Sequence, residues 1–461
     1  MLGLALSVPA VADCATLPKA GPFLAYTIEP KLVDGSLSLE VLVSFRLTST
    51  KTTELNLPSE WQGQKELYRA ISNLEALSPG TTIQVVEKAW QRRLTFQPGQ
   101  IVRLRYRVTK DWAGKINASS YLRVMLDQSY FQVAGRNFLV YPALPEDEEI
   151  PLFVEWKNMP PAWKVVDSFS GDFSCQFSKT YLIKLSNGLF AGGAIRLNKL
   201  DLEGKTVFVA TRGQWDFTDG QLVDLVRRIL TGERSFWHDP GAANYVLTLL
   251  PSDDAPGNYG GTALEDSFAL FMGEGTRLDF QTKFLLAHEM FHTWNPGKLG
   301  EIHGENPFWF TEGFTDYYAR TLLLRAGLIS AEDYANDVDT AYREYKASRV
   351  LHAKGSEVQD RFFSDDDFQR LAYLRGNFLA QRWNFLIQER SKGKQSLDDA
   401  MLNLLHQAQS RELVLTTRFL SEHFSAYVGP DAARDIQRYI EEGETIPLAI
   451  APSAPTAGHT R

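Results

Sequence analysis

The sequence predicts a multidomain α+β protein that consists of an N-terminal all-β domain, a mixed α/β domain and a C-terminal all-helical domain. Apolar residues alternate with period two in short runs up to about residue 210, and they recur with a helical period after residue 219. The chain has 461 residues, 44% of them hydrophobic, so it can bury a large core and divide into several domains. We place the three domains at residues 13–210, 211–328 and 329–448.

The two ends of the chain carry their own signals. Residues 2–12 are apolar and end in Ala10-Val11-Ala12, which fits a signal-peptidase site before Asp13. The basic residues expected before such a stretch are missing, so residues 1–12 are either the remnant of a signal peptide or a buried strand. On the first interpretation the protein is exported, to the periplasm or the extracellular space. Residues 449–461 are rich in Pro, Ala and Thr and are predicted to be a disordered tail.

Cys14 and Cys175 are the two cysteines of the chain. In an oxidising compartment they could form a disulfide, but two unpaired thiols are equally compatible with the sequence, because it does not place their Cα atoms. Neither lies in a ligand-like spacing with His, Asp or Glu, which argues against a thiolate metal site.

The N-terminal domain is predicted from short alternating runs bounded by turn residues. These runs predict strands at residues 38–45, 82–86, 102–108, 181–185 and 206–210.

The middle domain begins with an amphipathic helix around residues 222–230. A strand at 245–250, a glycine-rich loop at 256–262 and a strand at 267–271 follow. We expect the two strands to be neighbours, with the second one placed so that an extended peptide substrate can add to it as a further strand.

The C-terminal domain reads as successive amphipathic helices, with Ser330 and Thr416 as N-caps. The predicted helices span residues 330–349, 366–390, 397–409, 416–427 and 431–441.

Composition excludes some partners. The net charge of −8 and the pI near 5.6 argue against nucleic acid, whose binding requires a basic surface. No stretch reaches the about 20 apolar residues that span a bilayer, so we expect no stable membrane insertion. The sequence does not predict the oligomeric state.

A metal-binding pattern lies in the predicted helix 280–294, which begins after Asp279 and stops at 295–297. His288 and His292 are four residues apart and therefore leave the same face one turn apart. At this spacing both imidazoles can bind one Zn²⁺ at about 2.0–2.1 Å. Glu289 projects beside them and is the candidate general base that takes a proton from a zinc-activated water.

The third ligand is predicted to be Glu312, in a second helix that covers residues 309–324. Asp316, one turn further, is placed to accept the free ring N–H of a zinc-bound histidine. A third-histidine arrangement would require Gly at 295 and His at 298, but the chain has Asn295 and Lys298. His303 lies in a loop and is interpreted as solvated. Two core histidines without metal would leave Glu289 buried and unpartnered, so we predict one zinc ion per chain.

Four segments, at residues 259–261, 288–295, 309–318 and 373–376, resemble the M61 glycyl aminopeptidases, a family of gluzincin zinc peptidases. The resemblance runs over about residues 22–448. It implies a thermolysin-like catalytic domain between the β domain and the helical domain, and an enzyme that removes residues from the amino end of peptides. It also assigns Tyr373 as a donor to the developing oxyanion, although helix packing alone would also explain this tyrosine. The PDZ domain common in the family is not expected here.

The resemblance implies that Gly260, Gly261 and Glu265 bind the substrate, with Glu265 at its amino group. The segment from Gly260 to Asp266 is two residues longer than the family pattern, and Arg375 stands where the family often has lysine. Glu265 could reach an N-terminal ammonium, the longer loop could admit an endopeptidase substrate, or Glu265 could be a solvated carboxylate. The two glycines could equally serve a flexible turn. A third possibility is a zinc-containing protein that binds peptides without hydrolysing them.

Overall fold

The computed structural model describes residues 17–33, 35–48, 50–117, 119–144, 148–169, 175–300, 302–303, 306–410 and 414–448. The predicted signal segment 1–12 and the predicted tail 449–461 lie outside these residues. So do Cys14 and the side chain of Cys175, and their pairing stays a prediction. Among the described residues, no helix is both long and apolar enough to cross a membrane.

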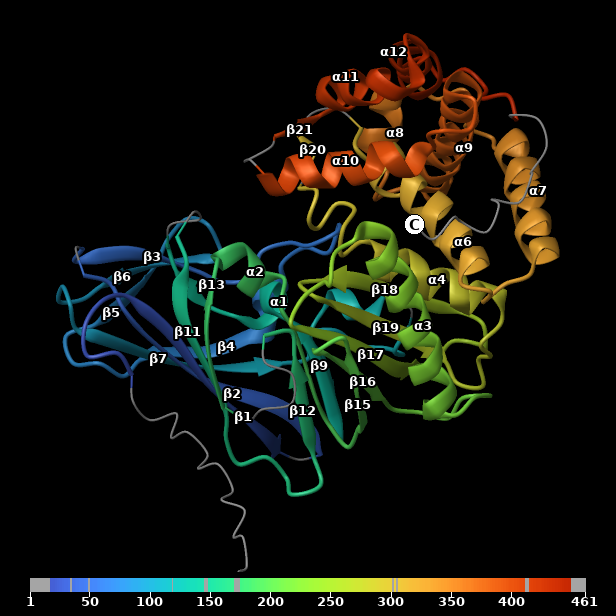
Figure 1. Cartoon of the computed structure of the whole chain (residues 1–461). Coiled ribbons are helices and arrows are strands. Elements are labelled where there is room, and N and C mark those ends of the chain that lie inside the picture. The colour runs from blue at the N-terminus through green and yellow to red at the C-terminus, as the bar shows by residue number, and fades with distance from the viewer. Residues whose placement is uncertain are drawn as a thin grey trace, which may run out of the picture.

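The first part of the chain forms three β-sheets (Figure 1). They are a six-stranded sheet in the order β13-β11-β1-β2-β7-β4, a four-stranded sheet β10-β3-β6-β5 and a four-stranded sheet β12-β14-β9-β8. The strands are β1 (Phe23–Val33), β2 (Ser36–Arg46), β3 (Thr52–Asn56), β4 (Ile71–Ala76), β5 (Thr82–Val85), β6 (Gln91–Thr95), β7 (Ile101–Thr109), β8 (Met125–Asp127), β9 (Tyr130–Ala134), β10 (Tyr141–Pro142), β11 (Ile150–Trp156), β12 (Lys164–Asp167), β13 (Cys175–Thr180) and β14 (Leu189–Gly193). Short helical turns join them: η1 (Leu67–Ala70), η2 (Ser120–Leu122), α1 (Gly135–Phe138) and α2 (Leu182–Ser186).

One predicted strand of this part is wrong. Residues 181–185 fall on helix α2 rather than on a strand. Ile183 is 53% exposed whereas Leu185 is 1% exposed, although a strand would place both on one face. Alternation over so few residues does not distinguish a strand from a single helical turn.

A central sheet of five strands, in the order β15-β16-β17-β19-β18, follows (Figure 1). Its elements are β15 (Arg196–Leu202), β16 (Lys205–Thr211), α3 (Asp219–Trp237), β17 (Asn244–Ser252), β18 (Tyr259–Leu264) and β19 (Ser267–Gly273). β16, β17 and β19 run parallel, and β18 is antiparallel to β19. This sheet spans the domain boundary that we predicted between residues 210 and 211, because β15 and β16 pair with the strands that follow it.

The structure corrects two expectations about this sheet. β17 and β19 are neighbours as predicted, but β18 covers the other edge of β19, so β19 has no free edge for a peptide. The glycine-rich segment predicted as a loop is strand β18 over most of its length. Glycine marks loops as well as strands that another backbone approaches closely, and the sequence pattern did not distinguish the two.

Helices make up most of the chain after the central sheet. They are α4 (Phe280–Phe291), α5 (Phe308–Thr311), α6 (Gly313–Arg325), α7 (Ala331–Ala347), α8 (Gly355–Arg361), α9 (Asp366–Ser391), α10 (Leu397–Ser410), α11 (Thr417–Val428), α12 (Asp431–Asp435) and a π-helical turn at Ile436–Glu441, labelled η3. Two short parallel strands, β20 (Ile302–His303) and β21 (Leu415–Thr416), join distant parts of this region. Both predicted caps are confirmed: Ser330 accepts a hydrogen bond from the Asp333 amide, and Thr416 from the Phe419 amide, each at 3.0 Å.

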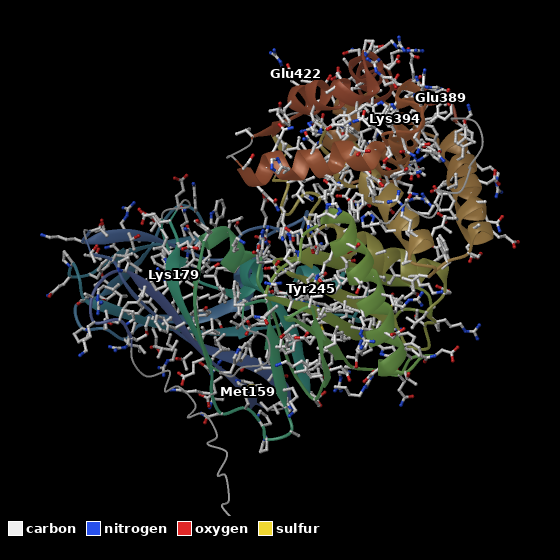
Figure 2. All side chains as sticks on the ribbon, in the orientation of Figure 1. Met159, Lys179, Tyr245, Glu389, Lys394 and Glu422 are labelled. Atoms are coloured by element: carbon white, nitrogen blue, oxygen red, sulfur yellow. The ribbon has the colours of Figure 1, made fainter. Side chains whose placement is uncertain are left out.

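The three parallel strands of the central sheet are buried over most of their length. One face packs with α3, α4, α6 and the later helices in a single hydrophobic core, and the other face packs on strands of the β12-β14-β9-β8 sheet. All seven residues of β19 are buried, as expected for a strand with both faces covered. Tyr245 of β17 lies deep among the side chains in the middle of the molecule, whereas Glu422 of α11 projects from its surface (Figure 2).

Candidate metal centre

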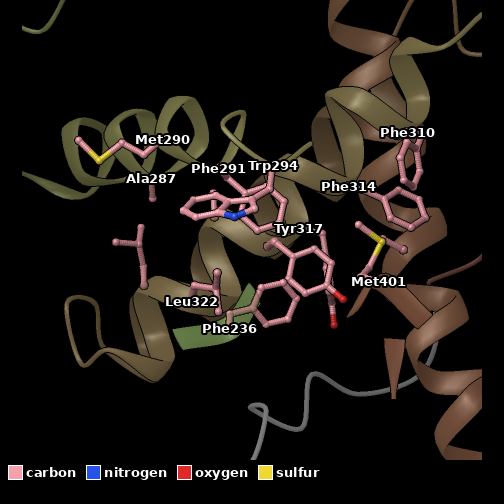
Figure 3. Close-up of a cluster of buried hydrophobic side chains, with 14 of the residues drawn as sticks. Phe236, Ala287, Met290, Phe291, Trp294, Phe310, Phe314, Tyr317, Leu322 and Met401 are labelled. Carbon is pink, nitrogen blue, oxygen red and sulfur yellow. The ribbon is translucent and has the colours of Figure 1, made fainter. Parts of the chain in front are cut away.

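Helix α4 carries the two histidines. It begins as predicted, because the side chain of Asp279 accepts a hydrogen bond from the Thr282 amide at 3.1 Å. Its apolar face, which includes Ala287, Met290 and Phe291, is packed into the shared core (Figure 3). Packing therefore fixes the helix on one side and turns the histidines toward α6.

The structure brings His288, His292 and Glu312 together. Their ligand atoms all lie within 4.8 Å of one another. The two Nε2 atoms are 3.0 Å apart, and Glu312 Oε2 lies 3.4 Å from each of them. Glu312 occupies the junction between α5 and α6, where we had predicted one continuous helix.

These distances fit a zinc ion. Two ligands that bind zinc at 2.0–2.1 Å with tetrahedral angles are separated by about 3.3 Å, close to the three separations observed here. His288 Nδ1 lies 2.8 Å from Asp316 Oδ1, and His292 Nδ1 lies 2.7 Å from the Asn295 carbonyl oxygen. Because both partners are acceptors, each Nδ1 carries a proton. In the neutral form that can bind a metal, each ring would present its Nε2 lone pair to the other ring and to Glu312. Lone pairs this close repel unless a cation lies between them.

The pKa shifts of the metal-free chain also indicate that this site favours a cation. Burial disfavours a charged His288, but hydrogen bonds to Asp316 and Glu312 outweigh burial and raise the pKa of His288 to about 10. Burial also tends to raise the pKa of Glu312, but the positive charge on His292 and hydrogen bonds from both histidines hold this pKa well below its usual range. The carboxylates thus create a negative site that favours a cation.

Glu289 lies beside the three ligands. Burial raises its pKa above the usual value, an effect that the neighbouring charges on His292 and His288 oppose. The backbone amide of Ala263 donates a hydrogen bond to this carboxylate. Strand β18 therefore runs along the site, and the raised pKa of Glu289 suits a group that must take up a proton near neutral pH.

Tyr373 of α9 completes the group that the sequence predicted. Its ring stacks on His288 with 5.7 Å between centroids. Burial, together with the charges on Glu312 and Glu289, raises its pKa well above the usual value, and its hydroxyl hydrogen-bonds Glu312. Tyr373 is therefore a neutral hydrogen-bond donor next to the metal ligands.

Residues 281–364 match the sequence profile of the M61 glycyl aminopeptidase family. The predicted resemblance to the M61 family is confirmed. No curated protein matches the chain.

Most of the chain also shares its fold with solved peptidase structures. An aminopeptidase N family protein from Idiomarina loihiensis superposes with a TM-score of 0.76 at 17% identity, covering 92% of this chain and 77% of that chain. An M1 zinc metallopeptidase from Deinococcus radiodurans gives 0.58 at 15% identity, with 94% and 95% covered. A mutant M1 zinc metallopeptidase from the same organism, bound to a Tyr-Ser-Ala substrate, gives 0.56 at 15% identity, with 93% and 94% covered. At these identities the likeness establishes the fold alone.

The predicted substrate-binding residues lie on or next to β18, the edge strand. A β-carbon on Gly261 would lie 2.6 Å from the Ala269 carbonyl oxygen, so packing against β19 explains this glycine. Gly260 pairs with Phe271 in the same ladder. Glu265 follows the end of β18, and its carboxylate lies 2.6 Å from Nζ of Lys184 in α2. Of the M61-like segment 260–266, residues 260–264 thus belong to strand β18 and residues 265–266 form the turn before β19. Ala263 is the residue whose backbone reaches Glu289.

Asn295 is a residue of the site whose role the sequence did not predict. Its carbonyl accepts the His292 ring proton, and its side-chain amide donates to the carbonyl of Phe310 at 3.1 Å and to the hydroxyl of Thr315 at 3.2 Å. It therefore connects the histidine helix to the segment that carries Glu312. The side chain of His303 lies outside the described residues.

Proposed function

We propose that this chain is a zinc-dependent peptidase, and that it acts on peptides from their amino end. The observation that carries the proposal is the meeting of His288, His292 and Glu312 at zinc-ligand separations beside the buried carboxyl of Glu289. One zinc ion binds per chain.

The residues around the ligands have distinct roles in this mechanism. Bound zinc supplies a Lewis acid and a water of lowered pKa. Glu289 takes the proton of the attacking water and passes it to the leaving amine, as its raised pKa favours. The phenol of Tyr373 donates a hydrogen bond to the oxygen of the carbonyl under attack. Asp316 and the Asn295 carbonyl hold the histidine rings with their Nε2 atoms toward the metal.

Strand β18 is the proposed platform for the peptide. It is the edge strand of the central sheet, so its outer backbone groups are available to an extended chain. An amide of the same strand, that of Ala263, already bonds the general base. A peptide paired with β18 would pass the ligands, with Glu265 as the carboxylate for its amino group.

An endopeptidase is the second candidate, and one contact favours it. Lys184 pairs with Glu265 at 2.6 Å and neutralises the carboxylate that an N-terminal ammonium would require. If Lys184 stays in place when substrate binds, a blocked peptide fits the site as well as a free one.

The test is hydrolysis of aminoacyl-p-nitroanilides and N-blocked peptides, with and without a chelator. Glu289→Gln is the active-site variant, and Glu422→Gln, which changes an exposed glutamate of α11, is the matched control. We expect chelator-sensitive release from free amino termini, lost only in Glu289→Gln. Cleavage of blocked peptides alone would identify an endopeptidase. Stoichiometric zinc without turnover of any substrate would refute the peptidase and favour a peptide-binding protein.

A further inference from the structure

Phe363, in the segment between α8 and α9, is a large aromatic side chain that is 59% exposed. It is nevertheless held in place by other rings. Its ring lies edge-on to Phe308 at 5.6 Å and to Phe362 at 4.9 Å, between centroids. An exposed ring that its neighbours orient is a preformed contact surface, since little rotational freedom is left to lose on binding.

A continuous series of ring contacts leads from Phe363 to the metal ligands. Phe308 stacks on Phe362 at 3.6 Å, and Phe362 is parallel to Tyr373 at 6.3 Å. Tyr373 in turn stacks on His288 at 5.7 Å. We call Phe308, Phe362, Phe363 and Tyr373 the aromatic wall.

Two observations place this wall next to Glu312, a ligand of the proposed zinc site. Phe308 precedes Glu312 by four residues across α5, so the two side chains leave neighbouring positions on one face. The hydroxyl of Tyr373 bonds Glu312 itself. In addition, a side chain added at Gly63 would meet the Phe363 carbonyl oxygen at 4.0 Å, so the loop that contains Gly63 borders Phe363.

We propose that Phe363 and Phe308 bind an aromatic side chain of the substrate next to the cleaved bond, and that peptides with Phe, Tyr or Trp there are the preferred substrates. This rests on the proposed peptidase function. Ring-on-ring contacts stabilise beyond the area that they bury, whereas a charged side chain against the wall would lose hydration without gaining an ionic partner. Three of the four wall residues are phenylalanines, which carry no ionisable group.

The test compares two peptides that differ only in having Phe or Ala beside the cleaved bond, placed in turn on each side of that bond. Phe363→Ala is the test variant. Phe385→Ala is the matched control, because Phe385 of α9 is also exposed, at 40%, but makes no ring contact with the wall among the described residues. We expect the wild type to prefer the Phe peptide in one of the two positions, and Phe363→Ala to reduce that preference about tenfold. Most of the change should lie in KM, and Phe385→Ala should keep the wild-type preference.

Three outcomes would overturn the proposal. The Phe363→Ala variant could keep the wild-type ratio between the two peptides, whether or not it slows both, which would indicate a structural role only. Chelator-sensitive cleavage of the Ala peptide, lost in Glu289→Gln, without any preference for Phe would reject the wall and leave the peptidase standing. If no peptide is cleaved in a chelator-sensitive way, both the aromatic wall and the peptidase function are rejected.

Discussion

Asp316 contacts His288, the first ligand of the proposed zinc site. Its carboxylate lies 2.8 Å from His288 Nδ1, and its other oxygen lies 3.8 Å from the guanidinium of Arg370. Asp316 is buried, so the negative charge is poorly screened and adds to the basicity of the ring. We predict that removing this carboxylate weakens zinc binding without preventing folding, because Arg370 retains its two contacts of 2.8 Å with Glu344.

Two substitutions separate the charge from the hydrogen bond. Asp316→Asn keeps an oxygen that can accept the His288 proton but removes the charge, whereas Asp316→Ala removes both. Partners of zinc-bound histidines contribute about 10- to 100-fold to metal affinity, or about 1.4 to 2.7 kcal/mol. We expect about a tenfold loss of zinc affinity for Asp316→Asn and about a hundredfold loss for Asp316→Ala.

The assay is competition for zinc between the protein and a fluorescent chelator at one fixed pH. Asp337→Asn is the control, because Asp337 pairs with Arg320 and, within the part of the chain described, forms no hydrogen bond or ion pair with His288, His292 or Glu312. Equal zinc affinity of the wild type and both Asp316 variants would refute the proposed role of this carboxylate. An equal loss in Asp316→Asn and Asp316→Ala would show that the charge matters and the hydrogen bond does not.

Three further predictions concern stability and metal. A β-carbon at Gly376 would lie 1.7 Å from the Trp309 carbonyl oxygen and 2.7 Å from the Cα of Gly313. Gly376→Ala should therefore lower the free energy of unfolding by about 3 kcal/mol, measured by urea titration of the metal-free protein. An unchanged free energy would contradict this close contact between the helices. Burial raises the pKa of Glu233 well above its ordinary 4.5, and neither carboxyl oxygen has a hydrogen-bond partner. The wild type should therefore lose stability relative to Glu233→Gln as the pH rises above 4.5, by up to about 1.4 kcal/mol per pH unit, whereas parallel stability curves would refute a buried neutral carboxyl. Zinc at 100 times its Kd should add about 2.7 kcal/mol to the free energy of unfolding, and thermal denaturation of His292→Ala should show no such increase.

The sequence predicted the parts of the site that depend on local periodicity. His288, Glu289 and His292 share one helix, and Asp316 follows Glu312 by one turn, so helical spacing alone relates them. The capping residue Asp279 is equally local. Local periodicity could not predict which strands belong to which sheet. The sequence of β16 resembles that of the strands before it, and only its pairing with β17 makes it part of the central sheet.

The contact of the Asn295 side-chain amide with the Phe310 carbonyl and the pairing of Glu265 with Lys184 are tertiary. Each joins segments whose separation along the chain carries no information about their distance in space: the Lys184 and Glu265 groups are 81 residues apart in sequence and 2.6 Å apart in the structure. The sequence marked Asn295 only as a helix stop before a proline. That the same residue orients His292 follows from the fold of the turn after α4.

The break of the helix at Glu312 shows how tertiary contacts complete the site. In a continuous helix the carbonyl groups of Phe310 and Thr311 would accept the amides of residues four positions ahead. Here Asn295 donates its side-chain amide to the Phe310 carbonyl at 3.1 Å, and the Thr315 hydroxyl donates to the Thr311 carbonyl at 2.6 Å. Side chains that take over these acceptors bend or interrupt a helix. Asn295 thus takes up a backbone acceptor at the point where the helix breaks, and the break is where Glu312 meets both imidazoles.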